Sequence, residues 1–343
     1  MKKKLSLLFI VIFIILLFVS CAKPEDPVSP TTESGLTLEN LLETTGYTYD
    51  AVATDDYIYA AEDQAGFKIF DKSDNSTVVD FYNTLYENMR IIIPHEEDSL
   101  LFIYNRYGES TGILVFGISD ISNPQIFPGI VGDTSGVFDM KTVKHEDGIE
   151  VIWSVNASSD KILLGGRYSY DEVNQMWTWT GGSTEFTFNY EIGKFDVVGD
   201  YFYVCSDQLG VTILERGEWE PIELGRFDTK GLPQAVKVVD NFVYVADRQN
   251  GIVIADATDK TNPVVVKELE TSGYAQEVDV EGNILAVASG GGGVYAFDIT
   301  DPTNPIEIGR IDDSEIGYTY NVDIHDGIIY ASTRLGVAKI SID

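Results

Sequence analysis

The sequence predicts an all-β protein, a seven-bladed β-propeller of four-stranded antiparallel blades in which an N-terminal strand closes the last blade. The first observation is a repeat of two similar stretches whose first glycines are 42 residues apart: GIVIADATDKTNP, beginning at Gly251, and GVYAFDITDPTNP, beginning at Gly293. The second is that each period holds several short strands. The third is that no 3.6-residue apolar periodicity persists outside the first 20 residues, which argues against a helical solenoid of similar period.

Six copies are marked by a glycine that begins an apolar strand. These anchors are Gly66, Gly112, Gly210, Gly251, Gly293 and Gly336. Successive gaps are 46, 98, 41, 42 and 43 residues, so the long gap should contain a seventh, divergent copy. Its strands are expected in GIEVIWSVN, DKILLGGRYSY and MWTWTGG, which begin at Gly148, Asp160 and Met176.

Each copy contains four short runs rich in valine, isoleucine and tyrosine, separated by Gly, Asp, Asn and Pro turns. In the sixth copy these runs are residues 276–280, 284–288, 294–298 and 306–311. Runs of this length and spacing predict antiparallel strands in meander order. Four strands in each period of about 42 residues are the pattern of propeller blades.

The last copy ends at its third strand, GVAKISID, and lacks a fourth. Residues 41–47 (LLETTGY) align with residues 268–274 (ELETSGY), which end the fourth strand of the fifth copy. A strand near the N-terminus should therefore complete the last blade and close the ring through hydrogen bonds between the chain ends. We place the propeller at residues 36–343 and expect deletion of residues 36–46 to destabilise all of it.

The N-terminus has the features of an export signal. Three lysines precede an apolar run from Leu5 to Val19, which is short for a membrane-spanning helix. The sequence Phe18-Val19-Ser20-Cys21 resembles the lipobox of bacterial lipoproteins, which implies a signal peptide at residues 1–20 and lipidation of Cys21. An uncleaved N-terminal anchor is the alternative. Residues 21–35, polar and rich in proline, read as an extended tether.

The strands GIVIAD, GFKIFD, GILVFG and GVYAFD, three of them followed by Thr-Asn-Pro or Ser-Asn-Pro, resemble the LVIVD repeat. This β-propeller repeat is frequent in secreted bacterial proteins and lipoproteins. The resemblance covers five or six copies and is poor between Ile149 and Gly182. It implies a propeller outside the cytoplasm, and it implies no particular reaction. From the resemblance, the lipobox and the acidic residues Glu25 and Asp26 that follow it, we expect a lipid-anchored protein of the cell envelope, at the outer membrane or cell surface.

Composition excludes several kinds of partner and site. A net charge of −32 disfavours nucleic acid. Cys205, inside the apolar stretch YFYVC, is expected to be a buried hydrophobe without a disulfide.

The three histidines fall in equivalent turns of different copies, so they should not converge on one metal. We expect no cofactor; calcium in the turns at residues 120–124, 259–263 and 301–305 is the alternative, although these turns lack the ligand spacing of an EF-hand.

One face of the propeller should hold the loops that join strands two and three together with the loops that enter strand one. These loops are rich in Tyr, Asp, Arg and Gln, which suit a shallow binding site for a peptide or a sugar. The predicted binding-face residues are Tyr47, Tyr49, Asp63, Arg90, Arg106, Asp207, Gln234, Asp247, Arg248, Tyr274, Gln276, Tyr318, Tyr320 and Arg334. Trp177 and Trp179 share a strand face and either form an exposed contact patch or pack on the propeller.

Three functions are compatible with this pattern. The first is a noncatalytic binding propeller, anchored to the envelope by lipid, that contacts a protein or glycan through this face. The second is a propeller hydrolase, lactonase-like or glycan-cleaving, using Asp63, Asp207 and Asp247 with a metal or as an acid/base pair. The third is a structural part of an envelope assembly. The binding or structural reading is favoured over catalysis because no Ser-His-Asp set and no Cys-His pair falls on the usable face.

Overall fold

The computed structural model describes residues 35–86, 88–107, 111–127, 136–156, 161–171, 173–181, 185–207, 209–217 and 221–343. They lie in one compact unit, Ser34–Asp343. The expected signal peptide, Cys21 and the tether up to residue 34 lie outside the described residues. Among the residues that are described, no helix is long and apolar enough to span a bilayer.

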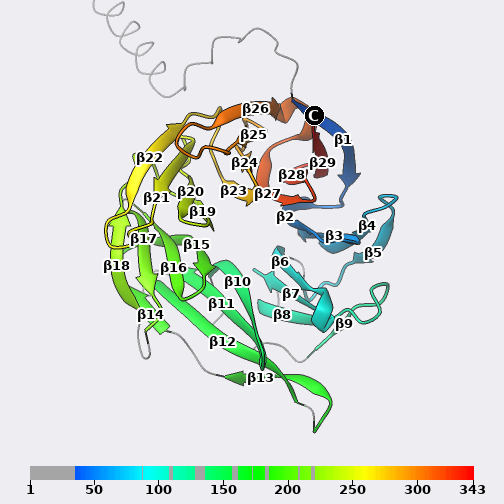
Figure 1. Ribbon diagram of the computed structural model, residues 1–343. Helices are drawn as coiled ribbons and strands as arrows, with labels where there is room; N and C mark the ends of the chain where they lie inside the picture. Colours follow the sequence, from blue (N-terminus) through cyan, green and yellow to red (C-terminus); the bar gives the residue numbers. More distant parts are fainter. Residues whose placement is uncertain are drawn as a thin grey trace, which may run out of the picture. The chain divides into compact units, whose positions relative to one another are not determined.

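Seven antiparallel sheets are arranged around a central axis (Figure 1) and confirm the predicted seven-bladed propeller. We number the blades in chain order. Blade 1 is β2 (Tyr47–Ala53), β3 (Tyr57–Asp63), β4 (Gly66–Asp71) and β5 (Thr77–Phe81). Blade 2 is β6 (Met89–His95), β7 (Leu100–Asn105), β8 (Gly112–Gly117) and β9 (Gln125–Ile126), with a 3-10 turn, η1 (Glu96–Asp98).

The remaining blades repeat this meander. Blade 4 is β15 (Ile192–Val198), β16 (Tyr201–Ser206), β17 (Gly210–Glu215) and β18 (Ile222–Phe227). Blade 5 is β19 (Ala235–Val239), β20 (Phe242–Ala246), β21 (Ile252–Asp256) and β22 (Val264–Leu269). Blade 6 is β23 (Glu277–Glu281), β24 (Ile284–Ala288), β25 (Val294–Asp298) and β26 (Ile306–Ile311), followed by a short helix α2 (Asp313–Ile316).

The predicted closure of the ring is confirmed in blade 7. This blade contains β27 (Thr319–His325), β28 (Ile328–Thr333) and β29 (Gly336–Ile342) from the C-terminal end, and β1 (Leu36–Glu43) as its outer strand. β1 pairs antiparallel with β29 along its whole length, from Leu36 opposite Ile342 to Glu43 opposite Gly336. Figure 1 shows the blue N-terminal strand beside the red C-terminal one.

Blade 3 is the divergent copy, and it is where the sequence predicted it. It contains β10 (Val137–His145), β11 (Gly148–Asn156), β12 (Lys161–Asp171), β13 (Met176–Gly181) and β14 (Glu185–Phe188). β12 is long enough to pair with β14 near its beginning and with β13 near its end. The extra hairpin explains the 98-residue gap between Gly112 and Gly210.

The two tryptophans of this hairpin pack on the propeller. The Trp177 ring is stacked on Tyr168, with centroids 5.7 Å apart and an interplanar angle of 3°. The Trp179 ring covers Gly166, where a Cβ would lie 2.0 Å from the indole, and its centroid is 6.0 Å from that of Trp153. Both rings are half-buried against the core between blades 2 and 3.

The core consists of seven apolar clusters, each made by side chains of two adjacent blades. The middle strands supply most of it because both of their faces are covered, as in β7, where all six residues are buried. Packing that lies between blades couples the stability of each blade to its neighbours. It also leaves the innermost strands free to line the axis.

Cys205, in β16, is fully buried, and burial raises the pKa of its thiol well above the ordinary value. The prediction that Cys205 is buried is confirmed, and among the described residues its thiol is free. We therefore expect the protein of residues 22–343 to react with a thiol reagent such as DTNB only as it unfolds. Labelling in native buffer at the rate of a small free thiol would contradict this placement.

Candidate functional site

The innermost strands of all seven blades enclose an axial cavity of about 670 Å³. One mouth of the cavity is lined by polar and aromatic side chains at or just before the start of the innermost strands, among them Tyr49, Arg90, Gln234, Gln276 and Tyr320. The wall deeper inside carries charged residues of both signs. Central channels of this kind are the usual place for a ligand in a radially closed fold.

Five of the deeper carboxylates have the same structural task. Each accepts a hydrogen bond from a backbone N–H of the innermost strand in the next blade, at 2.8–3.1 Å. The acceptor and donor pairs are Asp50 with Ile92, Asp139 with Phe195, Asp196 with Val238, Asp279 with Ile324, and Asp323 with Ala53. Because the contact recurs at five of the seven seams, it holds blades together and is not a local catalytic device.

Three lysines face these carboxylates from consecutive blades. Lys141 lies 3.7 Å from Asp139, Lys237 lies 2.7 Å from Asp279, and Lys194 pairs with Glu277 across the cavity. Burial lowers the pKa of Lys141, but the facing carboxylates, Asp139 first, outweigh burial and raise it overall. The three ammonium groups therefore stay charged.

This charged lining was not among the residues predicted from the sequence. A usable signal was present, because Lys194, Lys237 and Asp279 follow one another at 43 and 42 residues inside otherwise apolar strands. A charge repeated at the blade period on an innermost strand must face the axis.

At the predicted face, tyrosines and arginines form a continuous arc around the mouth. The Tyr49 and Tyr320 rings are stacked with centroids 4.4 Å apart, and the Tyr318 ring is 5.0 Å from Tyr320. The Arg90 guanidinium lies 3.7 Å above the Tyr49 ring. We call Tyr49, Arg90, Tyr318 and Tyr320 the tyrosine–arginine arc; it joins blades 7, 1 and 2.

Neighbouring polar groups hold the arc in place. Arg90 donates two hydrogen bonds to the Asp63 carboxylate, at 3.2 and 3.3 Å, and the Gln276 amide donates to the Tyr318 hydroxyl at 3.1 Å. Burial raises the pKa of the Tyr49 and Tyr318 hydroxyls, which keeps both protonated at neutral pH. The hydrogen bonds of Arg90 and Gln276, together with the stacking of the rings, hold the arc in one arrangement without a partner.

Outside the arc, the tyrosines that expose about half of their surface include Tyr47 at 47%, Tyr107 at 53% and Tyr274 at 54%. The Arg334 guanidinium lies 5.4 Å above Tyr47, and it hydrogen-bonds the Tyr320 hydroxyl of the arc. The Arg106 guanidinium lies 4.8 Å above Tyr107. Rings paired with guanidinium groups in this way suit protein contacts, because Tyr and Arg are enriched in binding hot spots.

The predicted grouping of loops follows from the backbone. The strand-two-to-three loops bridge to the entry of the next blade at Asp63 with Asn88 and at Arg248 with Ala275. Arg248, Gln234 and Asp207 are half-buried in these loops and entry segments.

Asp247 differs from the expectation of an accessible binding-face carboxylate. It is fully buried, and it accepts hydrogen bonds from the Asn250 amide of its own loop and from the Thr229 hydroxyl and Gly231 backbone N–H of the segment that enters the same blade. The two carboxylate oxygens of Asp247 therefore hold its loop and the entry segment of the same blade together. The sequence could not show this, because a loop aspartate looks the same whether it faces solvent or its own backbone.

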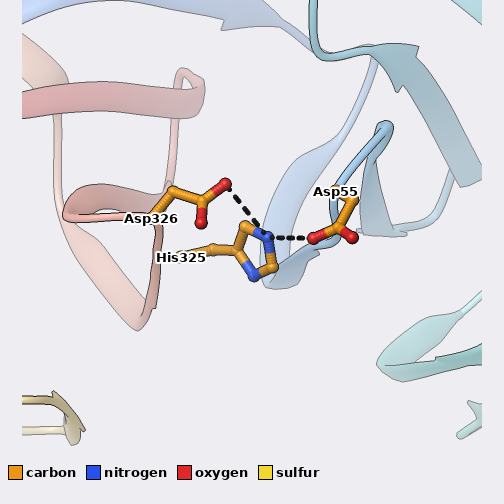
Figure 2. Close-up of side chains that lie close together, drawn as sticks. All are labelled: Asp55, His325 and Asp326. Atoms are coloured by element: carbon orange, nitrogen blue, oxygen red, sulfur yellow. Dashed lines mark hydrogen bonds and ion pairs between the residues drawn. The ribbon is translucent and has the colours of Figure 1, made fainter.

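The three histidines lie in the strand-one-to-two turns and have separate partners: His95 contacts Thr142, His145 contacts Glu150, and His325 contacts Asp55. Figure 2 shows the last of these, in which the His325 Nε2 atom is 3.1 Å from Asp55 and 3.5 Å from Asp326. The Asp326 carboxylate also binds the Lys72 ammonium at 3.0 Å.

These groups have the spacing of metal ligands, since their nearest atoms lie within 4.8 Å of one another. A divalent ion at this position would have to displace Lys72 from Asp326. As it stands, the cluster is an ionic network that joins blade 7 to blade 1 at the closing seam.

The proline-containing turns close through their own side chains. In two of them the aspartate Oδ1 accepts hydrogen bonds from the backbone N–H and hydroxyl of the threonine two residues later, as Asp259 does from Thr261 and Asp301 from Thr303. These hydrogen bonds lower the pKa of both aspartates. The turn chemistry explains why the Asp-x-Thr-Asn-Pro motif recurs.

Residues 230–271 and 272–313 each match the sequence profile of the LVIVD repeat. No curated protein sequence gives a significant match. Among solved structures, the WD40 β-propeller domain of Doa1 superimposes with a TM-score of 0.66 at 14% identity, over 90% of this chain and 96% of that one. The computationally designed Ika8 protein superimposes with a TM-score of 0.62 at 11% identity, over 88% of this chain and 98% of that one. At these identities the likeness is one of fold, and the chain is a seven-bladed β-propeller that carries LVIVD repeats.

Proposed function

We propose that this protein is a noncatalytic binding scaffold, attached to the cell envelope through a lipid on Cys21, that holds a partner on the face around the tyrosine–arginine arc. The observation that carries the proposal is the arrangement at the mouth: a fixed aromatic arc flanked by half-exposed tyrosines, each beside a polar or cationic side chain. Rigid aromatic anchors of this kind bind at a low cost in conformational entropy.

The propeller hydrolase has less support from the same residues. Asp63 is held by Arg90, and Asp247 is bound by Thr229 and Gly231, so neither carboxylate is poised as a free acid or base. Five carboxylates inside the channel serve the blade seams. Of the three aspartates that the hydrolase would use, this leaves Asp207, and one carboxylate makes no acid/base pair.

The binding proposal is tested by site-specific photocrosslinking on membranes of the native host. A photoreactive phenylalanine analogue replaces Tyr274, which is 54% exposed on the binding face, and as the matched control it replaces Ile306, which is 62% exposed on the outer strand of the same blade. We expect discrete adducts from position 274 only. Equal adducts from both positions, or none from position 274, would contradict the proposed face.

The lipid anchor is tested separately by labelling cells with a radioactive fatty acid. We expect label on the wild-type protein and none on Cys21→Ser, which should also leave the membrane fraction. Unchanged labelling of the variant would contradict lipidation of Cys21 and would leave the binding proposal unaffected.

A further inference from the structure

We propose that the partner is an acidic protein segment, which lies across the mouth and places its carboxylates on Arg106, Arg248 and Arg334. This inference rests on the proposed function and names the chemistry of its ligand. It comes from the three arginines, which form no ion pair among the described residues, from the engagement of Asp63 and Asp247 by other groups, and from the rings that orient two of the arginines.

Positive charge is scarce in this protein, with 23 Lys and Arg residues against 55 Asp and Glu. Most lysines and arginines of the described chain lie within 4 Å of a carboxylate, for example Lys72, Arg90, Arg216 and Lys339. Arg106, Arg248 and Arg334 have no such ion pair among the described residues, although acidic side chains outnumber basic ones. The other described cations without an ion pair, Arg226, Lys260 and Lys267, belong to outer strands and turns.

Two carboxylates of the predicted face are already engaged. Asp63 is bound by two nitrogens of the Arg90 guanidinium, and Asp247 is bound by Thr229, Gly231 and Asn250. Neither of these two carboxylates is therefore available to pair with the three arginines. A guanidinium group is the best side chain for bidentate binding of a carboxylate, so an external carboxylate is the complementary ligand.

Two of the arginines are also oriented in advance. Arg334 lies over Tyr47 and hydrogen-bonds Tyr320, and Arg106 lies over Tyr107. A guanidinium stacked on a ring keeps its edge N–H groups available while it loses less freedom on binding. The arginines come from blades 2, 5 and 7, so a single small anion cannot reach all of them, whereas an extended segment with spaced carboxylates can.

A peptide fits these rings better than a sugar does. Stacking of a pyranose needs a free aromatic face, but both faces of Tyr49 are covered, by Tyr320 and by Arg90. One face of Tyr47 and one of Tyr107 are likewise covered by guanidinium groups. Besides the second faces of Tyr47 and Tyr107, it is mainly edges and hydroxyls of tyrosine that remain, and these contact peptide backbones and side chains well.

The test is an array of immobilised 15-residue peptides in matched pairs, in which every Asp and Glu of one member is Asn or Gln in the other. We expect the protein of residues 22–343 to bind acidic members at least about tenfold more tightly than their amide partners. For the best acidic peptide in solution, Arg334→Gln and Arg248→Gln should each weaken binding about fivefold to tenfold. Arg226→Gln, which removes an arginine without an ion pair from outer strand β18, should leave the affinity unchanged.

The outcomes separate this inference from the proposed function. Equal binding of acidic and amide peptides, equal loss with Arg226→Gln, or no binding of acidic peptides would each overturn the acidic ligand. If position 274 still crosslinks a partner in those cases, the binding scaffold stands and only its ligand chemistry is wrong. If position 274 crosslinks nothing, both fail.

Discussion

Removal of residues 36–46 is expected to destabilise the whole propeller, because these residues contain strand β1, the outer strand of blade 7. β1 buries Leu36 to 3% and Leu42 to 4% exposure. Leu42 packs with Tyr330 and Val337 of blade 7 and with Ala51 of blade 1, so its loss opens the seam at which the ring closes. Burial of the two leucines stabilises the fold by about 4 to 6 kcal/mol, and the backbone ladder to β29 adds to this.

We expect the melting temperature of the deletion variant to fall by at least about 10 °C, measured by calorimetry on residues 22–343 with and without the deletion. β29 becomes an exposed edge, so concentration-dependent aggregation should accompany the loss. A synthetic peptide of residues 35–46 should restore stability when added in excess, and the same peptide with Leu36→Asp and Leu42→Asp should not. An unchanged melting temperature would show that the closing strand is dispensable.

The second expectation concerns Asp323, whose carboxyl lies in the channel. Burial, followed by the charge of Asp279, raises its pKa to about 8. The charge of Asp50 acts in the same direction and that of Lys237 opposes it. Its Oδ2 atom accepts a hydrogen bond from the Ala53 N–H across the closing seam. The carboxyl group therefore takes part in closing the ring, while its buried surroundings disfavour its ionised form.

The sign of the pH effect follows from the direction of this shift. Between the unfolded pKa of 3.8 and the folded pKa of about 8, the folded state binds a proton that the unfolded state has lost. The contribution of Asp323 to the free energy of unfolding therefore falls as pH rises through this interval and is constant above it. Between pH 5 and pH 8 the decrease is about 3 to 4 kcal/mol.

Asp323→Asn keeps a carbonyl-type acceptor for Ala53 and cannot ionise. We expect the variant to be about as stable as the wild type at pH 5 and more stable at pH 9, in urea denaturation across that range. Asp326→Asn is the matched control: its carboxylate lies on the surface, and Lys72 lowers its pKa, so its titration lies below this range. Parallel pH profiles for Asp323→Asn and wild type would show that Asp323 is ionised throughout.

The sequence alone determined the fold to the level of strands. The glycine anchors and the double gap between two of them predicted the blade count, since six of the seven blades have a glycine at or directly before the start of the third strand. A side chain at such a position would collide with the neighbouring strand. At Gly251, for example, φ is +77° and a Cβ would lie 2.1 Å from the Leu269 carbonyl oxygen. Even the closing strand could be found, because the missing fourth strand of the last copy has its counterpart at residues 36–43.

The sequence also predicted which loops share one face, because the meander of a blade assigns each loop to one end of the propeller. Only the tertiary structure decided which contacts the residues on that face make. Arg90 and Asp63 bind each other, Asp247 is bound by Thr229, Gly231 and Asn250, and Arg334 has no ion pair among the described residues, although the sequence pattern treats all four alike. Such differences depend on distances between blades that are far apart in the chain, and local patterns of 42 residues contain no information about them.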